Sequence, residues 1–180
     1  DLYMLDKMME GLMKTVVKFG PIAVRNPEDY EARANLMWAS SWAINGFVNG
    51  GKRKAWSCHP MEHELSAIYD ITHGLGLAIL TPRWMNYCLS EERVDKFVSF
   101  GVNVFDIDPS LPSMEIAREA IARLEHFLFD ELGLQRTLTE VGIGREKLSE
   151  MARKACRYGD IRGFMTLTPE DVERIYEMSL

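Results

Sequence analysis

Residues 59–76, HPMEHELSAIYDITHGLG, carry three of the four histidines in a chain of 180 residues. His59 and His73 stand fourteen positions apart, and His63 follows His59 by four. Imidazole is the commonest protein ligand for divalent transition metals, and its charge changes most readily near neutral pH. The density of histidines therefore indicates a metal site, a proton-transfer site, or both.

Helix geometry limits how these histidines meet. A straight helix over residues 59–73 would separate His59 from His73 by roughly 21 Å, because each residue adds about 1.5 Å. The chain must therefore reverse if both are to share one ion. Pro60 favours a helix start, and Gly74 and Gly76 favour a helix end. We expect a short helix between these points, with His59 and His73 outside its regular part and close together.

The residues alone leave alternatives open. His59 and His63, four positions apart, also fit two neighbours on an exposed helix face. Cys58 is either a fourth metal donor or a small apolar filler of the core. The order His-x-x-x-His-Glu is not the HExxH zinc motif.

A longer pattern resembles a known family. Residues 59–87, HPMEHELSAIYDITHGLGLAILTPRWMNY, resemble the C-terminal signature of the iron-containing (group III) alcohol dehydrogenases. HELSA followed by THG is most similar to the NADPH-dependent butanol dehydrogenase branch. Three further runs fit the same branch, so that the resemblance spans essentially the whole chain: EDYEARANLMWASSWAINGF, ELGLQRTLTEVGI and LTPEDVERIYEMSL.

The resemblance implies a set of site residues. In that family iron or zinc is held by an Asp and a His of one Asp-x-x-x-His helix and by two histidines fourteen residues apart. The latter pair falls on His59 and His73, and the family's histidine near nicotinamide and substrate falls on His63. No histidine here follows an aspartate by four positions, so the resemblance places the first ligand pair upstream of Asp1. We interpret His126 as structural or exposed.

The resemblance also implies a fold and a function. It implies an all-α multi-helix bundle in which residues 1–180 form one C-terminal metal-binding domain of the dehydroquinate synthase-like architecture. A nucleotide-binding α/β domain would lie outside this chain. The whole enzyme would interconvert small alcohols and aldehydes with NADP(H) or NAD(H) and a divalent metal, and the chain alone is expected to be inactive. The alternatives are a stand-alone helical protein that binds metal through Cys58, His59, His63 and His73, and an interaction module without metal.

Composition excludes several other classes. The chain is 47% hydrophobic and 27% charged, with a formal net charge of −6, so we expect neither nucleic acid nor an anionic membrane as partner. No apolar run approaches the ~20 residues of a membrane span. Three scattered cysteines suit a reducing cytoplasm. The chain opens on Asp without a signal-like run, which predicts a cut or engineered N-terminus. A homo-oligomer is compatible with the sequence.

Apolar residues recur at helical spacing through most of the chain, and no segment shows sustained alternation, which predicts an all-α fold. A first helix over residues 5–16 is expected to end at Gly20 and Pro21. A second should begin with Asn26 as its N-cap and bury Trp38 and Trp42.

Two further signals concern the rest of the chain. Pro82 should kink or restart the helix that follows His73, and Thr168-Pro169 should begin the last helix. The basic run 52–54 in a glycine-rich loop is interpreted as solvated, with a phosphate contact as the alternative.

Overall fold

A computed structural model describes residues 2–50 and 56–180, so the basic run 52–54 lies outside the described residues. The expected all-α fold is confirmed. Within the described ranges the extended pairings are two isolated bridges, Arg157 with Gly159 and Ile161 with Leu167. The α-helices are α1 Tyr3–Arg25, α2 Tyr30–Ile44, α3 Cys58–Tyr69, α4 His73–Cys88, α5 Val94–Phe105, α6 Ser113–Glu125, α7 Leu148–Ala155 and α8 Pro169–Met178.

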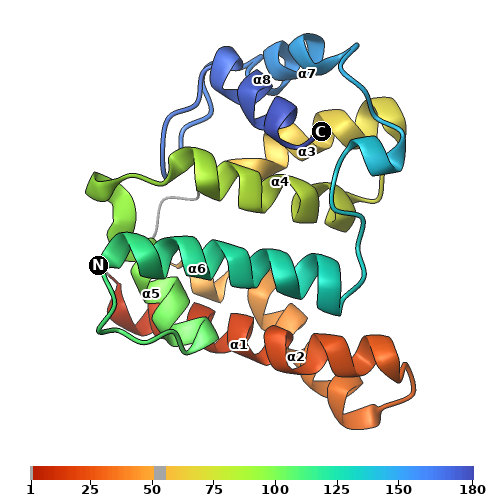
Figure 1. Cartoon of the computed structure of the whole chain (residues 1–180). Helices are drawn as coiled ribbons and strands as arrows, with labels where there is room; N and C mark the ends of the chain where they lie inside the picture. The colour runs from red at the N-terminus through yellow and green to blue at the C-terminus, as the bar shows by residue number, and fades with distance from the viewer. Residues whose placement is uncertain (1, 51–55) are drawn as a thin grey trace. The chain divides into compact units, whose positions relative to one another are not determined.

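The chain divides into two compact units (Figure 1). The first contains α1, α2, α5 and α6, together with the 3-10 turns Phe47–Asn49 and Glu91–Arg93 and the π-helical segment His126–Glu131. The second contains α3, α4, α7 and α8 with the 3-10 turn Thr139–Val141. The histidine-rich stretch belongs entirely to the second unit.

In the first unit α5 and α6 pack closely at Gly101. A methyl group on Gly101 would lie 3.0 Å from both Ala120 Cβ and Ile116 Cγ2. Ile107, Ile116 and Ala120 form a buried apolar cluster at this contact. A residue without a side chain is therefore needed where the two helices meet.

The end of α1 differs from the expectation. The helix continues through Gly20 and Pro21 to Arg25. Gly20 is buried, and a methyl group there would lie 3.3 Å from Leu132 and 3.4 Å from Phe127. The prediction that the helix ends at Gly20 and Pro21 was wrong. Leu132 and Phe127 pack closely against Gly20 and stabilise the helical conformation, although glycine and proline by themselves favour a helix end.

The second helix also departs from the expectation. Its N-cap is Asp29, whose carboxylate accepts a 2.8 Å hydrogen bond from the Ala32 amide, so Asn26 is not the cap. The buried positions of α2 are Ala32 and Ala39, while Trp38 is 67% exposed. The expectation of a buried Trp38 was wrong because the small alanines occupy the buried face.

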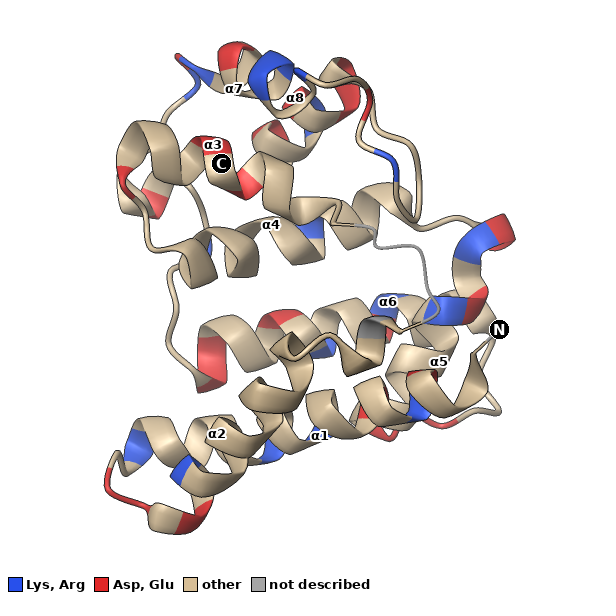
Figure 2. Ribbon diagram, turned by 180° about the vertical axis from the view of Figure 1, so that it is seen from behind, with Lys and Arg blue, Asp and Glu red and all other residues tan. Residues whose placement is uncertain are grey.

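The second unit is organised around α4, which carries one charged residue, Arg83, along its length (Figure 2). The helix continues through Pro82 to Cys88 without restarting. The Tyr87 hydroxyl donates a 2.5 Å hydrogen bond to Asp171, which ties α4 to α8. This bond and burial raise the pKa of Tyr87 to about 12.

Helix α8 begins as expected and closes the core of this unit. Thr168 and Asp171 form a reciprocal capping box, with Pro169 at the first helical position. Tyr176 is fully buried and donates a 2.6 Å hydrogen bond to the carbonyl oxygen of Met61 in α3. Burial is the main reason that the pKa of Tyr176 is raised. Helices α3 and α8 are thus joined by a buried polar contact as well as by apolar packing.

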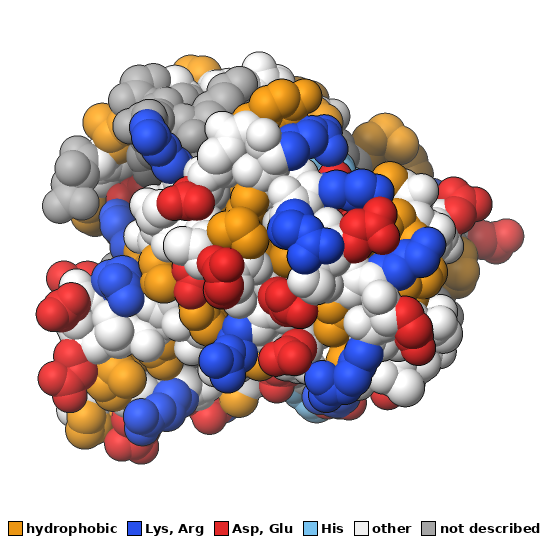
Figure 3. All heavy atoms as spheres, turned by 90° about the horizontal axis from the view of Figure 1, so that it is seen from above, with side chains coloured by type: hydrophobic (Ala, Val, Ile, Leu, Met, Phe, Trp, Pro, Cys, Tyr) orange, Lys and Arg blue, Asp and Glu red, His pale blue; other side chains and the backbone are white. Residues whose placement is uncertain are grey.

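The described helices do not meet the requirements of a membrane span, because none of them combines the length and apolar character needed to cross a bilayer. On the face seen in Figure 3, Lys and Arg side chains are interspersed with Asp and Glu side chains. Acidic and basic side chains are therefore mixed on this face.

Gly101 offers a direct test of the first unit's packing. We expect Gly101→Ala to lower the free energy of unfolding by about 1–3 kcal/mol, because the added methyl group overpacks the contact between α5 and α6. Gly11 in α1 has no heavy atom within 4 Å of the same position. Gly11→Ala should instead raise the stability by about 0.5–1 kcal/mol through helix propensity. Denaturant unfolding measures both, and equal effects of the two variants would contradict this packing.

Candidate metal centre

A short turn between α3 and α4 reverses the chain beside the histidines. Helix α3 ends at Tyr69, and Asp70 takes a left-handed conformation with φ 53°. Its amide donates a 3.0 Å hydrogen bond to the carbonyl oxygen of Ser66. Asp70, rather than a glycine, therefore ends the helix; Gly74 and Gly76 lie inside α4. Aspartate tolerates this conformation better than most residues, because its short side chain bonds locally.

The reversal brings three imidazole rings together. The His59 and His73 ring centroids are 5.2 Å apart, those of His63 and His73 are 5.5 Å apart, and those of His59 and His63 are 6.0 Å apart. His59 lies in the first turn of α3 and His73 is the first residue of α4. The two helices therefore place side chains from sequence-distant positions around one point, although both residues lie within helices rather than outside them.

Glu62 joins this group, and sequence reasoning missed it. Ligand atoms of Glu62, His63 and His73 all lie within 4.8 Å of one another. The Glu62 side chain is fully buried and contacts His73 Nδ1 through Oε2. Gly76, which was expected from the sequence to favour a helix end, leaves room for this carboxylate.

Electrostatics favour an unprotonated ring at His59. Its pKa is lowered from the ordinary value, first by desolvation and then by the neighbouring His73 and His63, while Glu62 opposes the shift. The Trp56 ring packs edge-on against His59 with centroids 4.3 Å apart. A metal ligand must offer a free lone pair, and a lowered pKa keeps that lone pair available at neutral pH.

Cys58 does not take part in the histidine group. Its thiol is packed against the core of the second unit. Burial raises the pKa of this thiol to about 12, against the opposing effect of a hydrogen bond with Thr81. A thiol that resists ionisation is a poor metal ligand, so the structure favours the core-filler interpretation of this cysteine.

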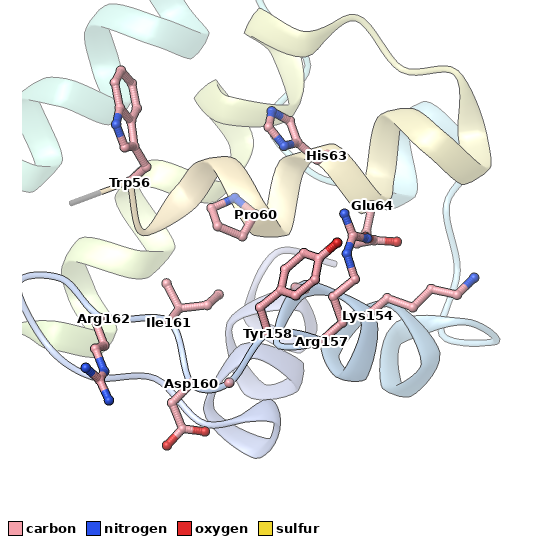
Figure 4. Close-up of a pocket in the computed structure, with 12 residues that line it drawn as sticks. Trp56, Pro60, His63, Glu64, Lys154, Arg157, Tyr158, Asp160, Ile161 and Arg162 are labelled. Carbon is pink, nitrogen blue, oxygen red and sulfur yellow. The ribbon is translucent and has the colours of Figure 1, made fainter. Parts of the chain in front are cut away.

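A pocket of about 360 Å³ opens beside His63 (Figure 4). Trp56 and Pro60 line it from α3 and the residues before it, while Tyr158 and Ile161 line it from the segment after α7. Its volume falls within the range of roughly 300–1,000 Å³ that is usual for small-molecule sites. The pocket therefore offers space for a small molecule directly next to an exposed imidazole.

An ion pair between an exposed arginine and a buried glutamate lies in the wall of this pocket. Arg157 donates a 2.9 Å hydrogen bond to Glu64, whose side chain is 7% exposed. In Figure 4, Arg157 reaches Glu64 on one side of α3, while His63 projects from another. This contact ties α3 to the segment that follows α7.

His126 stands apart from the centre, as expected. It lies in the first unit, its side chain is 60% exposed, and its Nδ1 is 3.0 Å from Asp130. The fourth histidine therefore belongs to an exposed local pair.

Comparisons with known proteins agree with the geometry. Residues 3–180 match the profile of the Fe-containing alcohol dehydrogenase family, C-terminal. NADH-dependent butanol dehydrogenase A of Clostridium acetobutylicum is 52% identical over 179 residues, which cover 98% of this chain and 46% of that protein. The NADPH-dependent aldehyde reductase YqhD of Escherichia coli is 30% identical, with 98% and 46% covered.

A solved structure shows the same fold. The crystal structure of NADH-dependent butanol dehydrogenase A from Thermotoga maritima superposes with a TM-score of 0.87 at 31% identity, covering 98% of this chain and 46% of that one. The chain thus spans about half the length of the relatives it matches. The expected likeness to butanol dehydrogenases is confirmed. Among the relatives, the butanol dehydrogenase is named as NADH-dependent and the aldehyde reductase as NADPH-dependent. The chain belongs to the Fe-containing alcohol dehydrogenase family and corresponds to its C-terminal part.

Proposed function

We propose that this chain is the metal-binding part of an oxidoreductase that interconverts small alcohols and aldehydes with a nicotinamide cofactor. The observation that carries the proposal is the convergence of the His59, His63 and His73 rings on two helices joined by a tight turn. Relatives named as butanol dehydrogenases and as an aldehyde reductase support the reaction class.

The donor atoms present fit a divalent transition metal. We assign His59 and His73 as two of its ligands, because imidazole suits both iron and zinc. Catalytic metals normally have at least three protein ligands and an open position, so two imidazoles are too few. We propose that an Asp-x-x-x-His element in a part of the whole protein outside this chain supplies the further ligands. A metal held there would act as a Lewis acid toward the substrate oxygen, and a bound NADH or NADPH would supply the hydride chemistry.

The chain's own residues then have distinct tasks. His59 offers a lone pair at neutral pH, since desolvation lowers its pKa, and Trp56 restrains its ring by edge-on packing. His63 is exposed and is one of the residues that line the pocket, and its ring centroid is 5.5 Å from that of His73. We propose that His63 orients the substrate hydroxyl or relays its proton.

The pocket beside His63 is our candidate for the carbon chain of the substrate. Trp56, Pro60 and Ile161 present apolar surface to it, and charged residues line the rest of the wall: Glu64, Lys154, Arg157, Asp160 and Arg162. We propose that the apolar part of the lining contacts the short alkyl chain of an alcohol or aldehyde.

Removal of a metal ligand tests the assignment of the centre. In the whole protein, we expect His59→Ala to weaken zinc binding by about 10- to 100-fold or more. Loss of a residue that only supports a ligand typically costs about 10- to 100-fold, and loss of a ligand itself should cost at least as much. Competition with a coloured chelator measures the affinity. His126→Ala is the matched control, because His126 is exposed and pairs with Asp130. Native zinc affinity in the His59→Ala protein would refute this ligand assignment.

A second variant separates the role of His63 from ligation. We expect His63→Ala to lower turnover by about 10²–10⁴-fold, the usual contribution of a general acid or base. Its zinc affinity should stay close to native, and the pH dependence of turnover should change. Steady-state kinetics across pH and the chelator assay provide both readings. Unchanged turnover at every pH would exclude a proton relay, and a zinc loss equal to that of His59→Ala would make His63 a ligand.

A further inference from the structure

Glu62 is a buried carboxylate at the centre that the ligand assignment above does not use. Its side chain is fully buried on α3 and contacts His73, the first residue of α4. A charged group is costly to bury unless hydrogen bonds or an opposite charge compensate for lost water. The contacts of this carboxylate therefore indicate why the fold keeps it.

Both carboxylate oxygens have partners. The Ser66 hydroxyl, one turn further along α3, lies 2.5 Å from Oε1 and also 3.0 Å from the carbonyl oxygen of Ile71. Oε2 contacts Nδ1 of His73. Because each carboxylate oxygen has a hydrogen-bonding partner, the plane of the carboxylate is fixed, and Oε2 faces the imidazole.

Helix α4 is shaped to receive this side chain. A methyl group on Gly76 would lie 2.7 Å from Glu62 Cγ and 2.8 Å from Oε1. Only a residue without a side chain leaves this space at that position. Gly74, two residues earlier in the same helix, has nothing within 4 Å of the equivalent point. The close approach is therefore specific to the turn of α4 that faces Glu62.

The chemistry of the contact determines which nitrogen of His73 carries the proton. A carboxylate oxygen accepts hydrogen bonds, so a proton on Nδ1 of His73 would match its contact with Oε2. In a neutral imidazole with its proton on Nδ1, the lone pair lies on Nε2. Metal-binding histidines typically donate their other N–H to a carboxylate or a carbonyl in this way.

We propose that Glu62 is a positioning residue that holds His73 in the Nδ1–H form and directs its Nε2 toward the metal. The inference rests on the proposed function for the metal, but the state of the ring can be measured without metal. Glu62 lies near enough to His63 and His73 to be considered a ligand itself. The Glu62 carboxylate, however, contacts Nδ1 of His73 and the Ser66 hydroxyl, so it lies on the Nδ1 side of the ring and not on the Nε2 side.

The test uses the whole protein with ¹⁵N-labelled histidine, free of metal, at about pH 8, well above the ordinary histidine pKa of about 6.5. Long-range ¹H–¹⁵N correlation spectra report which ring nitrogen is protonated, and a His73→Gln protein assigns the signals. We expect native His73 to be in the Nδ1–H form and Glu62→Ala to lose that preference. Zinc affinity, measured by chelator competition, should fall about 10- to 100-fold.

Glu64→Ala is the matched control, because it removes another buried acid of α3 that pairs with Arg157 instead. It should leave both the His73 form and the zinc affinity unchanged. If Glu62→Ala does not fold, Gly76→Ala compared with Gly74→Ala displaces the carboxylate without removing it, and the same two readings apply.

The outcomes separate the two proposals. A native Nδ1–H signal in Glu62→Ala, or in Gly76→Ala, would overturn the positioning role whatever the zinc affinity. An equal loss of zinc affinity in Glu64→Ala would also overturn it, since the effect would then come from general loss of packing. Native zinc affinity in both His59→Ala and His73→Ala would refute the metal site itself, while the spectra would still decide whether Glu62 sets the form of His73.

Discussion

The reversal of the chain between α3 and α4 is the constraint on which the candidate site depends. Residues fourteen positions apart on one straight helix would be separated by roughly 21 Å, whereas the His59 and His73 rings are 5.2 Å apart. The left-handed Asp70 makes the reversal within a few residues. Helix α4 then continues into the core, where Ile79 and Leu80 are fully buried, so that His73 stands on a rigid support.

Two buried acids of α3 bind two different segments of the second unit. Glu62 contacts His73 of α4, and Glu64 pairs with Arg157 beyond α7. Between them His63 projects into solvent at the edge of the pocket. Beneath them Met61 and Leu65 are fully buried. Apolar packing and paired charges therefore both stabilise this helix. Side chains on such a rigid helix lose little conformational entropy when they bind a ligand.

Some of this was predictable from local chemistry. The capping box at Thr168 and Asp171 is specified by residues three positions apart, and the structure forms it. The histidine spacing required a reversal, and one exists. Other features depend on neighbours far along the chain. Gly20 remains helical because Phe127 and Leu132 pack on it, and no local rule places Glu62 against His73, eleven residues later.

We propose that His59 and His73 bind the same ion. X-ray diffraction from crystals of the whole protein with zinc, collected at the zinc absorption edge, locates that ion directly. We expect an anomalous peak about 2.0–2.1 Å from one ring nitrogen of each of these two residues, the usual Zn–N distance. A zinc peak held by other residues, with either imidazole outside coordination distance, would contradict this proposal.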